Sequence, residues 1–463
     1  AADIPVDGGL LNVERIKAEI ERQAEFGTKG GLKLEAHLGQ DTDFDNGKTE
    51  EGQPGSGEHN EENIQMDASG SDAAAEELSE LKNKFRTYYS RILFFAFLTK
   101  DAVSSLSQII ACGNSEDNRR IMKNLCLDVE VLTLMARHMN PFILSSLDYK
   151  IQNINKLSCD ESISPIERAV TAMGKFGKLS EGEITTPLSA AKAMIDMLPD
   201  DCFRTLDKNH KILDIASKMG EFTIAVYLKC MQLGIAPEDI ADCIEAIPTS
   251  SAAYEFTRKI YEILGLHTRC ISSSFSTYDI LNIRQDDGSA DYEKVSLLLR
   301  QKEYIDDVRL DNELLEKHGV KMNFNAVVGN PPYQEEAETS GKNNGQKPRK
   351  NIFQHFVLQA AELSDSNSVM IFPGLRWMHQ SGKGMKEFGK ELINSPSIDK
   401  IIFYPDSKDI FEGVDIPDGI SIVRLGAESG RDTFEYEFVS GGEHAVMRRE
   451  KPGDSLFVVN PKD

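Results

Sequence analysis

The spacing of apolar and polar residues changes twice along the chain. Residues 1–40 show no pattern that assigns them to an element, and residues 41–72 are nearly free of large apolar side chains. Because Gly, Ser, Asn, Asp and Glu dominate the second segment, it is predicted to be a disordered linker. From residue 73, apolar side chains recur at spacings of three and four, which is typical of amphipathic helices. We therefore expect a small helical connector domain over residues 73–160, with a packing role and no chemistry of its own.

Strand and helix patterns alternate from residue 161 onward. Ser164-Pro165 and Thr186-Pro187 each open a helix, since proline is favoured in the first turn. Helix candidates separate a series of apolar strand candidates, which read HKILDIA, IADCIEAI, TRCISSS, FNAVVGN and SVMIFP. This alternation predicts an α/β fold over residues 161–430, a mostly parallel sheet with helices on both faces. The segment DIPDGISIVRL is expected to close the sheet as a hairpin strand, and residues 431–463 to begin a C-terminal region.

Acidic residues follow the first strands, where open sheets of this kind bind ligands. The strand KILD ends at Asp214, and Gly220 in the following turn lets the backbone approach a ligand. The next strand is expected to end at Glu245, whose carboxylate suits two ribose hydroxyls. The third strand leads to Asp279 and Ile280. The Asp279 carboxylate could accept from an exocyclic amino group, and Ile280 could flank a purine ring. Each acid alone is equally consistent with an exposed loop, but their order favours an adenosine-containing cofactor.

The strongest signal is the tetrapeptide Asn330-Pro331-Pro332-Tyr333 directly after the apolar strand FNAVVG. The exocyclic amine of adenine is a poor nucleophile because its lone pair is delocalised into the ring. The Asn330 side-chain oxygen and the Pro331 carbonyl can each accept one amine hydrogen, which favours a tetrahedral nitrogen. The prolines have fixed φ and no N–H, so they hold these acceptors without internal competition. Such a site requires a flipped-out base stacked on Tyr333; the alternative is a proline-rich turn with an aromatic plug.

These features resemble the amino-methyltransferases that modify adenine N6 in DNA, and more narrowly the methylase part of restriction-modification enzymes. The resemblance extends over residues 165–425, and its motif order is similar to the gamma arrangement, with target recognition at the C-terminal end. It implies a Rossmann-like S-adenosylmethionine-dependent methyltransferase domain with Asn330, Pro331, Pro332 and Tyr333 as catalytic residues. The cofactor contacts that it implies are Thr186 and Pro187 at the methionine end, the first-motif residues Asp214, Ala216, Gly220 and Phe222, Glu245 at the ribose, and Asp279 and Ile280 at the adenine ring.

The first cofactor motif departs from the family pattern Asp-Pro-x-x-Gly-x-Gly-x-Phe. Ile215 stands in place of the proline, and Lys218 stands in place of the first glycine. Two roles for Lys218 are open: a salt bridge with a cofactor carboxylate, or coverage of the helix start.

A basic stretch, SGKNNGQKPRKN, follows the tetrapeptide. Its positive residues suggest a flexible clamp on DNA phosphates, although a solvated surface loop is the competing interpretation. The residues concerned are Lys342, Lys347, Arg349 and Lys350. Farther along, Trp377 follows the strand SVMIF and is expected to be packed rather than stacked on DNA.

Composition narrows the class of protein. The net charge of −23 argues against a nucleic-acid partner at first sight, but thirteen acids and one base lie between residues 41 and 80, so about half of the excess sits there. No apolar run approaches the roughly 20 residues that cross a bilayer, so no membrane partner is expected. The seven cysteines show no CxxC pair or metal-ligand spacing, which predicts reduced thiols in a cytoplasmic protein without a metal site.

We therefore expect N6-methylation of a flipped-out adenine in double-stranded DNA, as the modification part of a restriction-modification system. No Walker-type loop or nuclease constellation is recognisable, so a restriction or helicase part is expected outside this chain, which begins with Ala1 and reads as a fragment of a longer polypeptide. Two rivals are a protein glutamine N5-methyltransferase, which also uses such a turn, and a non-catalytic DNA-binding scaffold. The length and the basic stretch favour DNA, and the intact Asn330 argues against the scaffold.

Overall fold

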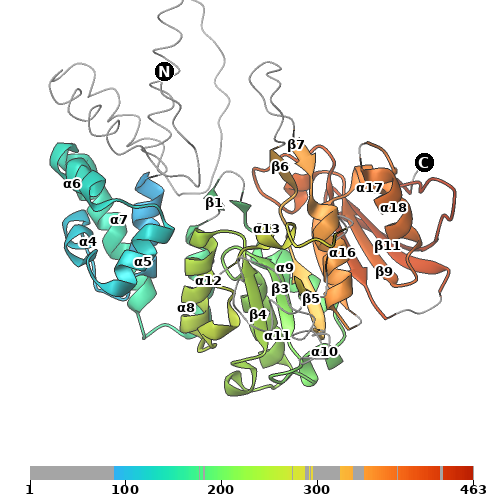
Figure 1. Cartoon of the computed structure of the whole chain (residues 1–463), viewed down its shortest axis with the longest axis horizontal. Helices are drawn as coiled ribbons and strands as arrows, with labels where there is room; N and C mark the ends of the chain where they lie inside the picture. The colour runs from blue at the N-terminus through green and yellow to red at the C-terminus, as the bar shows by residue number, and fades with distance from the viewer. Residues whose placement is uncertain are drawn as a thin grey trace, which may run out of the picture. The chain divides into compact units, whose positions relative to one another are not determined.

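The computed structural model forms two compact units, Ala1–Ser162 and Ile163–Asp463 (Figure 1). The residues that it describes are 88–461, apart from gaps at 177, 181–182, 274, 287–290, 292–293, 296–323, 337–348, 366, 383 and 428–430. The segment 1–40, the acidic linker 41–72 and the first part of the helical domain, 73–87, therefore lie outside the described residues.

The first unit is helical throughout its described part, which confirms the helical region expected before the sheet. Residues 88–98 are helical and are followed by α4 (Leu106–Cys112), α5 (Glu116–Asn124), α6 (Val129–His138) and α7 (Pro141–Cys159). Polar side chains accept backbone hydrogens in the first turn of all four labelled helices, namely Ser105, Ser115, Asp128 and Asn140. Inside the unit, the buried Thr99 hydroxyl donates to Asn118 Oδ1 over 2.8 Å.

An eight-stranded sheet forms the centre of the second unit, in the order β12-β11-β9-β10-β8-β5-β3-β4. The neighbours β4, β3, β5 and β8 are parallel, and so are β9 and β11, whereas β10 and β12 run antiparallel to their neighbours. The mostly parallel sheet is thereby confirmed. The strands span β3 (Ile212–Ser217), β4 (Ile244–Pro248), β5 (Ala326–Gly329), β8 (Ser368–Pro373), β9 (Ile398–Tyr404), β10 (Ile420–Leu425), β11 (Thr433–Ser440) and β12 (Glu443–Glu450).

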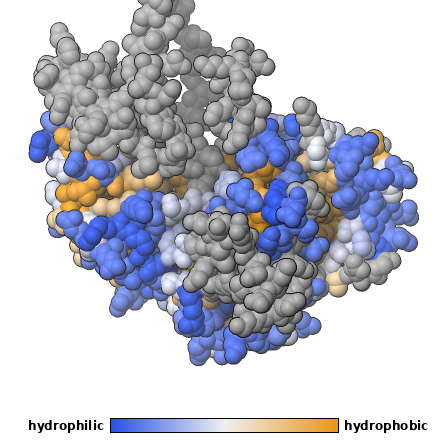
Figure 2. All heavy atoms as spheres, in the orientation of Figure 1, coloured by the Kyte–Doolittle hydropathy of each residue, from blue (hydrophilic) through white to orange (hydrophobic). Residues whose placement is uncertain are grey.

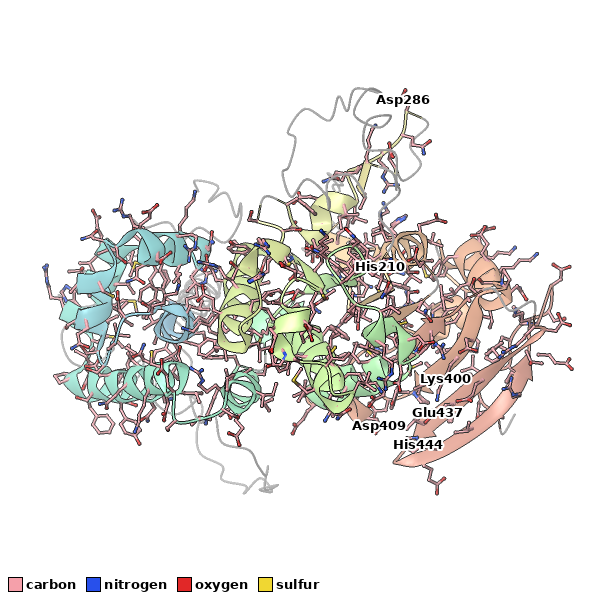
Figure 3. All side chains as sticks on the ribbon, turned by 90° about the horizontal axis from the view of Figure 1, so that it is seen from below. His210, Asp286, Lys400, Asp409, Glu437 and His444 are labelled. Carbon is pink, nitrogen blue, oxygen red and sulfur yellow. The ribbon has the colours of Figure 1, made fainter. Side chains whose placement is uncertain are left out.

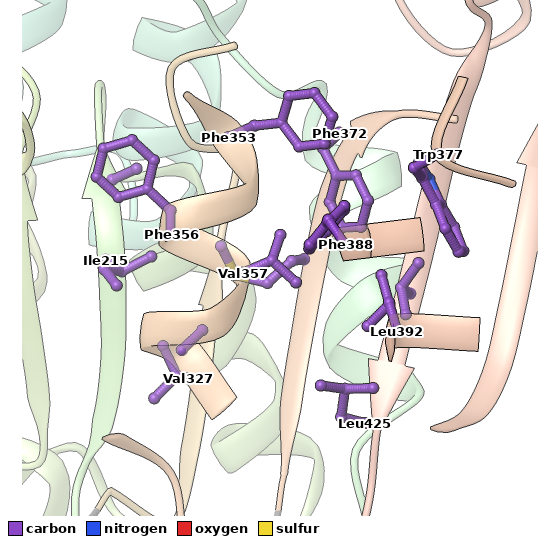
Figure 4. Close-up of a cluster of buried hydrophobic side chains, with 14 of the residues drawn as sticks. Ile215, Val327, Phe353, Phe356, Val357, Phe372, Trp377, Phe388, Leu392 and Leu425 are labelled. Carbon is purple, nitrogen blue, oxygen red and sulfur yellow. The ribbon is translucent and has the colours of Figure 1, made fainter. Parts of the chain in front are cut away.

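Helices cover both faces of the sheet at its centre. As a result, every residue of β3, β4 and β5 is buried. Phe353, Phe388 and Leu392 from two of these helices pack on one face with side chains of β3, β5 and β8 (Figure 4). The helices are α8 (Pro165–Lys175), α9 (Leu188–Asp196), α10 (Asp201–Arg204), α11 (Glu221–Gln232), α12 (Ser251–Leu264), α13 (Thr277–Ile280), α16 (Phe353–Leu363), α17 (Leu375–Met378) and α18 (Met385–Asn394).

Local sequence explains where several elements begin. Ser164 and Glu167 form a reciprocal capping box at α8, with Pro165 in its first turn. Pro187 is the residue before the first turn of α9.

Trp377 on α17 is fully buried in the apolar cluster that also contains Phe353 and Phe388, and its indole N–H donates to Ser421 Oγ over 3.1 Å, so it is packed as expected.

The prediction of a strand at TRCISSS is wrong. Thr268–Cys270 forms a short 3-10 helix, and only Ile271 bridges to Ala246 of β4. The turn begins directly after α12, which ends at Leu264 and is followed by Gly265 with φ +74°, and this leaves no extended stretch long enough for a ladder.

The sheet also extends beyond the predicted closing strand. Residues 431–463, which are expected to begin a C-terminal region, contribute two strands to this sheet: β11 pairs in parallel with β9, and β12 completes the edge. Lys400 on β9 lies 2.8 Å from Glu435 and 2.9 Å from Glu437 on β11, and His444 on β12 lies 2.7 Å from Glu437 (Figure 3). These ion pairs connect the three strands on an outward-facing side of the sheet.

The visible face of the second unit is mostly hydrophilic (Figure 2). Within the described ranges, no helix combines the length and the apolar character needed to cross a bilayer.

Candidate active site

The tetrapeptide Asn330–Tyr333 follows the buried strand β5 at its carboxyl end. Val327 and Val328 are completely buried and anchor this strand between β3 and β8. A Cβ at Gly329 would lie 2.9 Å from Cγ2 of Ile215, so only glycine lets β5 approach β3 this closely. The close approach fixes the position from which Asn330 projects.

The Asn330 carboxamide is buried, and only one end of it is satisfied. Its Nδ2 donates to Thr186 Oγ1 over 3.1 Å, and both residues are almost inaccessible, at 2% and 0% exposure. Its Oδ1 is buried without a hydrogen-bond partner. Leaving a buried carbonyl oxygen without a donor costs about 1–3 kcal/mol, so such an oxygen is typical of a site that receives its donor from a ligand.

The rest of the tetrapeptide forms a rigid wall beside Asn330. Pro331 and Pro332 are buried, and the Tyr333 carbonyl accepts from Ile352 N over 3.0 Å, directly before α16. The Tyr333 ring is half-buried against the apolar cluster. Burial raises the pKa of its hydroxyl, which has no partner. The ring is therefore held in place and still presents part of its surface.

The turn after β3 contains the second group of unsatisfied polar atoms. Asp214 Oδ1 accepts from Ala216 N over 3.2 Å, whereas Oδ2 is buried without a partner. Gly220 has φ +78°, and a Cβ there would lie 3.2 Å from Ile260, so this position requires glycine. The turn leads into α11, whose first residue is Glu221.

Asp214 and Glu221 form a buried acidic pair. Burial first, and then the charge of Glu221, raise the pKa of Asp214 from 3.8 to about 8. Glu221 is completely buried and accepts from Thr186 N over 3.2 Å and from Met219 N over 2.9 Å. Two carboxylates in one buried turn favour a cationic ligand, since a positive charge would relieve their repulsion.

Lys218, which stands in place of the first glycine of the family motif, is buried and points toward the backbone of a neighbouring segment. Its Nζ donates to the Ile184 carbonyl over 2.8 Å, and its charge lowers the pKa of Asp214, although by less than the effects that raise it. Ile184 ends the short strand β2 (Glu183–Ile184), which pairs with β1 (Lys178–Ser180). Lys218 therefore ties the turn after β3 to the segment that precedes Thr186.

Glu245 is not at the carboxyl end of its strand, so the predicted strand end is wrong. It is the second residue of β4, which continues to Pro248 because Ala246 and Ile247 are also fully buried. Its Oε1 lies 2.5 Å from Nζ of Lys211, directly before β3. This partner lies toward the amino ends of the strands, away from Asn330.

The other predicted cofactor residues lie at the start of α13 or in the apolar core. Asp279 lies in the first turn of α13, where its Oδ2 accepts from Ser276 N over 2.6 Å. Ile280 belongs to the apolar cluster, and Phe222 and Ala216 are also buried. Their proposed contacts with a cofactor stay predictions.

The described part of the basic stretch lies beside the tetrapeptide. Arg349 and Lys350 are exposed on β7 (Arg349–Asn351), which pairs with β6 (Gln334–Glu336) immediately after Tyr333. Lys342 and Lys347 lie outside the described residues.

Sequence analysis missed two basic groups near this hairpin. His355 on α16 is half-buried, and burial together with the charges of Arg284 and Lys350 lowers its pKa. Arg284 comes from the segment after α13, and its proximity to His355 has no signal in the local sequence. Among the described residues, no group of three or more His, Cys, Asp or Glu side chains could hold a metal ion.

Comparison with known proteins identifies part of this unit. The family model for Eco57I restriction-modification methylase matches residues 223–411. A protein of Mycoplasma pneumoniae described as an uncharacterized adenine-specific methylase is 32% identical over 172 residues, which are 36% of this chain and 40% of that protein. The matched segment thus spans less than half the length of this relative.

Solved structures are similar only at a distance. The type I restriction-modification methyltransferase subunit from Streptococcus thermophilus has 15% identity and a TM-score of 0.38, covering 81% of this chain and 84% of that one. The Type ISP enzyme LlaGI, with a DNA substrate mimic, has 14% identity and a TM-score of 0.42, covering 93% and 40%. The family match confirms the resemblance to restriction-modification methylases over residues 223–411, which include the tetrapeptide.

Proposed function

We propose that this chain transfers a methyl group from S-adenosylmethionine to the N6 amine of an adenine flipped out of double-stranded DNA. In the cell it would act in the cytoplasm as the modification part of a restriction-modification system. The observation that carries the proposal is the buried, partnerless Oδ1 of Asn330 at the carboxyl end of β5.

The chemistry of Asn330 suits an amino group as the acceptor of the methyl. An amide oxygen that takes one amine hydrogen draws the nitrogen lone pair out of conjugation with the purine ring. Because Asn330 is held by Thr186 and by the buried prolines, its oxygen needs little reorganisation to do so. The Pro331 carbonyl is the second proposed acceptor, on the same rigid turn.

The turn after β3 suits the cofactor. Glu221 provides negative charge for the ammonium and sulfonium groups, and a bound cation would favour release of the proton that the raised pKa of Asp214 retains. The buried Oδ2 of Asp214 has no other partner. S-Adenosylmethionine, when bound, supplies a methyl group activated by its sulfonium. Gly220 allows the chain to turn close to the ligand. Lys218 holds the neighbouring segment through its hydrogen bond to the Ile184 carbonyl.

The surroundings of Asn330 favour a flipped nucleotide over a small amine. The half-buried ring of Tyr333 offers a surface on which a purine can stack. Arg349 and Lys350 follow on the adjacent hairpin and suit the flanking phosphates. Lys342 and Lys347 would extend the same basic arm.

Methyl-labelled S-adenosylmethionine and unmethylated bacterial genomic DNA provide the test, with nucleoside mass spectrometry as the readout. Labelled N6-methyladenine is expected from the wild-type chain and not from the Asn330→Ala variant. Cofactor binding in a calorimeter without label in DNA would contradict the proposal. The same label on release factors would then identify a glutamine methyltransferase. Failure to bind the cofactor would leave a non-catalytic DNA-binding scaffold as the remaining interpretation.

A further inference from the structure

Thr186 joins two parts of the site that are distant in sequence. Its backbone N–H donates to Glu221 Oε1 over 3.2 Å, and its hydroxyl accepts from Asn330 Nδ2 over 3.1 Å. Thr186 and Glu221 are fully buried, and Asn330 is 2% exposed. In this low-dielectric setting each of these hydrogen bonds is stronger than it would be in water.

The position of the Thr186 hydroxyl is fixed from the turn after β3. Glu221 accepts from Thr186 with one oxygen and from Met219 N with the other, over 2.9 Å. Lys218 from the same turn donates to the Ile184 carbonyl, two residues before Thr186. The segment that carries the hydroxyl is therefore held at two points by the residues that are proposed to receive the cofactor.

The orientation of the Asn330 amide decides what the site can do. A carboxamide has an acceptor at one end and two N–H donors at the other, and a half-turn exchanges them. With Nδ2 bonded to Thr186, the acceptor Oδ1 is the end left for a ligand. After a half-turn, N–H groups would face the hydrogens of the target amine, and transfer would be blocked.

We infer that Thr186 is a positioning residue for Asn330: its hydroxyl holds Nδ2 and thereby aims Oδ1 at the amine to be methylated. The link Glu221–Thr186–Asn330 connects the cofactor turn with the amide that receives the base. This inference rests on the proposed function and replaces the expectation that Thr186 touches the methionine end of the cofactor.

Isosteric substitution separates positioning from cofactor contact. Thr186→Val keeps the shape but removes the acceptor, so kcat should fall about 10–100-fold, as expected for a misplaced reacting group. The Kd of S-adenosylmethionine, measured by titration calorimetry, should stay within about twofold of the wild type. Thr186→Ser keeps the hydroxyl and should restore kcat to within about threefold.

A matched control exists in the helical unit. Thr99 and Asn118 form another buried threonine–asparagine hydrogen bond, of 2.8 Å, so Thr99→Val should lower stability while leaving methyl transfer intact. An unchanged kcat in Thr186→Val would overturn the inference. So would a loss explained by weaker cofactor binding that Thr186→Ser does not repair.

A second measurement does not depend on activity. The side-chain amide signal of Asn330 in a nitrogen-15 spectrum can be identified by its disappearance in Asn330→Asp. Thr186→Val should speed hydrogen exchange of this amide at least about tenfold, because its buried acceptor is lost. Equal exchange rates would refute the link. An inactive wild type with a protected Asn330 amide would instead refute the proposed function.

Discussion

Two buried polar clusters at either end of β3 are built in opposite ways. Lys211, directly before the strand, pairs with Glu245 on β4 over 2.5 Å, and both side chains are nearly inaccessible. Asp214, within the strand, and Asn330, beyond the adjacent β5, each keep one buried oxygen without a partner. The first cluster is complete and supports the fold. The second is left incomplete, as expected of a site that a ligand completes.

The same contrast appears in the ionisation of the two clusters. Burial favours the neutral amine of Lys211, but the Glu245 carboxylate outweighs it and raises the pKa of Lys211 above its ordinary value. Burial raises the pKa of Asp214, and its nearest acidic neighbour, Glu221, raises it further. A cation bound near Asp214 would lower its pKa again. Lys211 and Glu245 already neutralise each other and need no further charge.

The largest effect is expected from breaking the complete cluster. Lys211→Met leaves Glu245 buried without its cation and should lower the free energy of unfolding by about 3–5 kcal/mol, measured in urea. Combining Lys211→Met with Glu245→Leu removes the unpaired charge and should recover most of this loss. A single variant as stable as the wild type would show that the pair does not support the fold.

Removing Asn330 should have the reverse pattern of effects. Asn330→Ala is expected to lower kcat by about 10²–10³-fold, as losing one preorganised group at a reacting centre does. Its unfolding free energy should fall by no more than about 1–2 kcal/mol, because the lost hydrogen bond from Nδ2 to Thr186 is partly offset by removal of the partnerless Oδ1. Near-normal turnover in this variant, assayed on genomic DNA, would contradict the role of the tetrapeptide.

Asp214 should give stability a characteristic pH dependence. Its pKa of about 8 in the fold, against 3.8 ordinarily, means that the folded chain retains a proton that the unfolded chain releases. This contribution is complete below about pH 4 and is lost as the pH rises toward 8, with a slope of at most about 1.4 kcal/mol per pH unit. Asp214→Asn should flatten the slope between these pH values. Parallel curves for variant and wild type would rule out a raised pKa.

The smallest effect concerns the basic hairpin. Changing Arg349 and Lys350 together to Gln should reduce the slope of log affinity for DNA against log salt by about 1–2. Folding should be unaffected, since both side chains are exposed and Lys350 lies 3.8 Å from Glu335. Lys390→Gln, on α18, is the matched control, and an equal change there would indicate non-specific attraction.

Sequence alone predicted the centre of the sheet because its strands are continuous apolar runs. The strands around Asp214 and before Asn330 are buried on both faces, and a glycine or proline marks the turn after each. The strands β9, β11 and β12 were missed because charged residues such as Lys400 and Glu437 interrupt them, and only pairing across strands satisfies these charges.

The site was predicted only where its signals are local. The tetrapeptide and Gly220 are readable in a few consecutive residues, whereas Glu245 was misplaced because a buried strand gives no mark of where it ends. The hydrogen bond between Thr186 and Asn330 spans 144 positions, so no spacing in the sequence could indicate it.

The packing of Trp377 has a practical consequence. It is the one tryptophan in the chain, and it is completely enclosed in the apolar cluster beside Phe388. Intrinsic fluorescence excited at the long-wavelength edge of its absorption band, where tyrosine does not absorb, will therefore report on the second unit alone. Far-ultraviolet circular dichroism will respond to the helices of both units. The two optical signals, followed in one urea titration, will separate melting of the helical unit from melting of the sheet without any label.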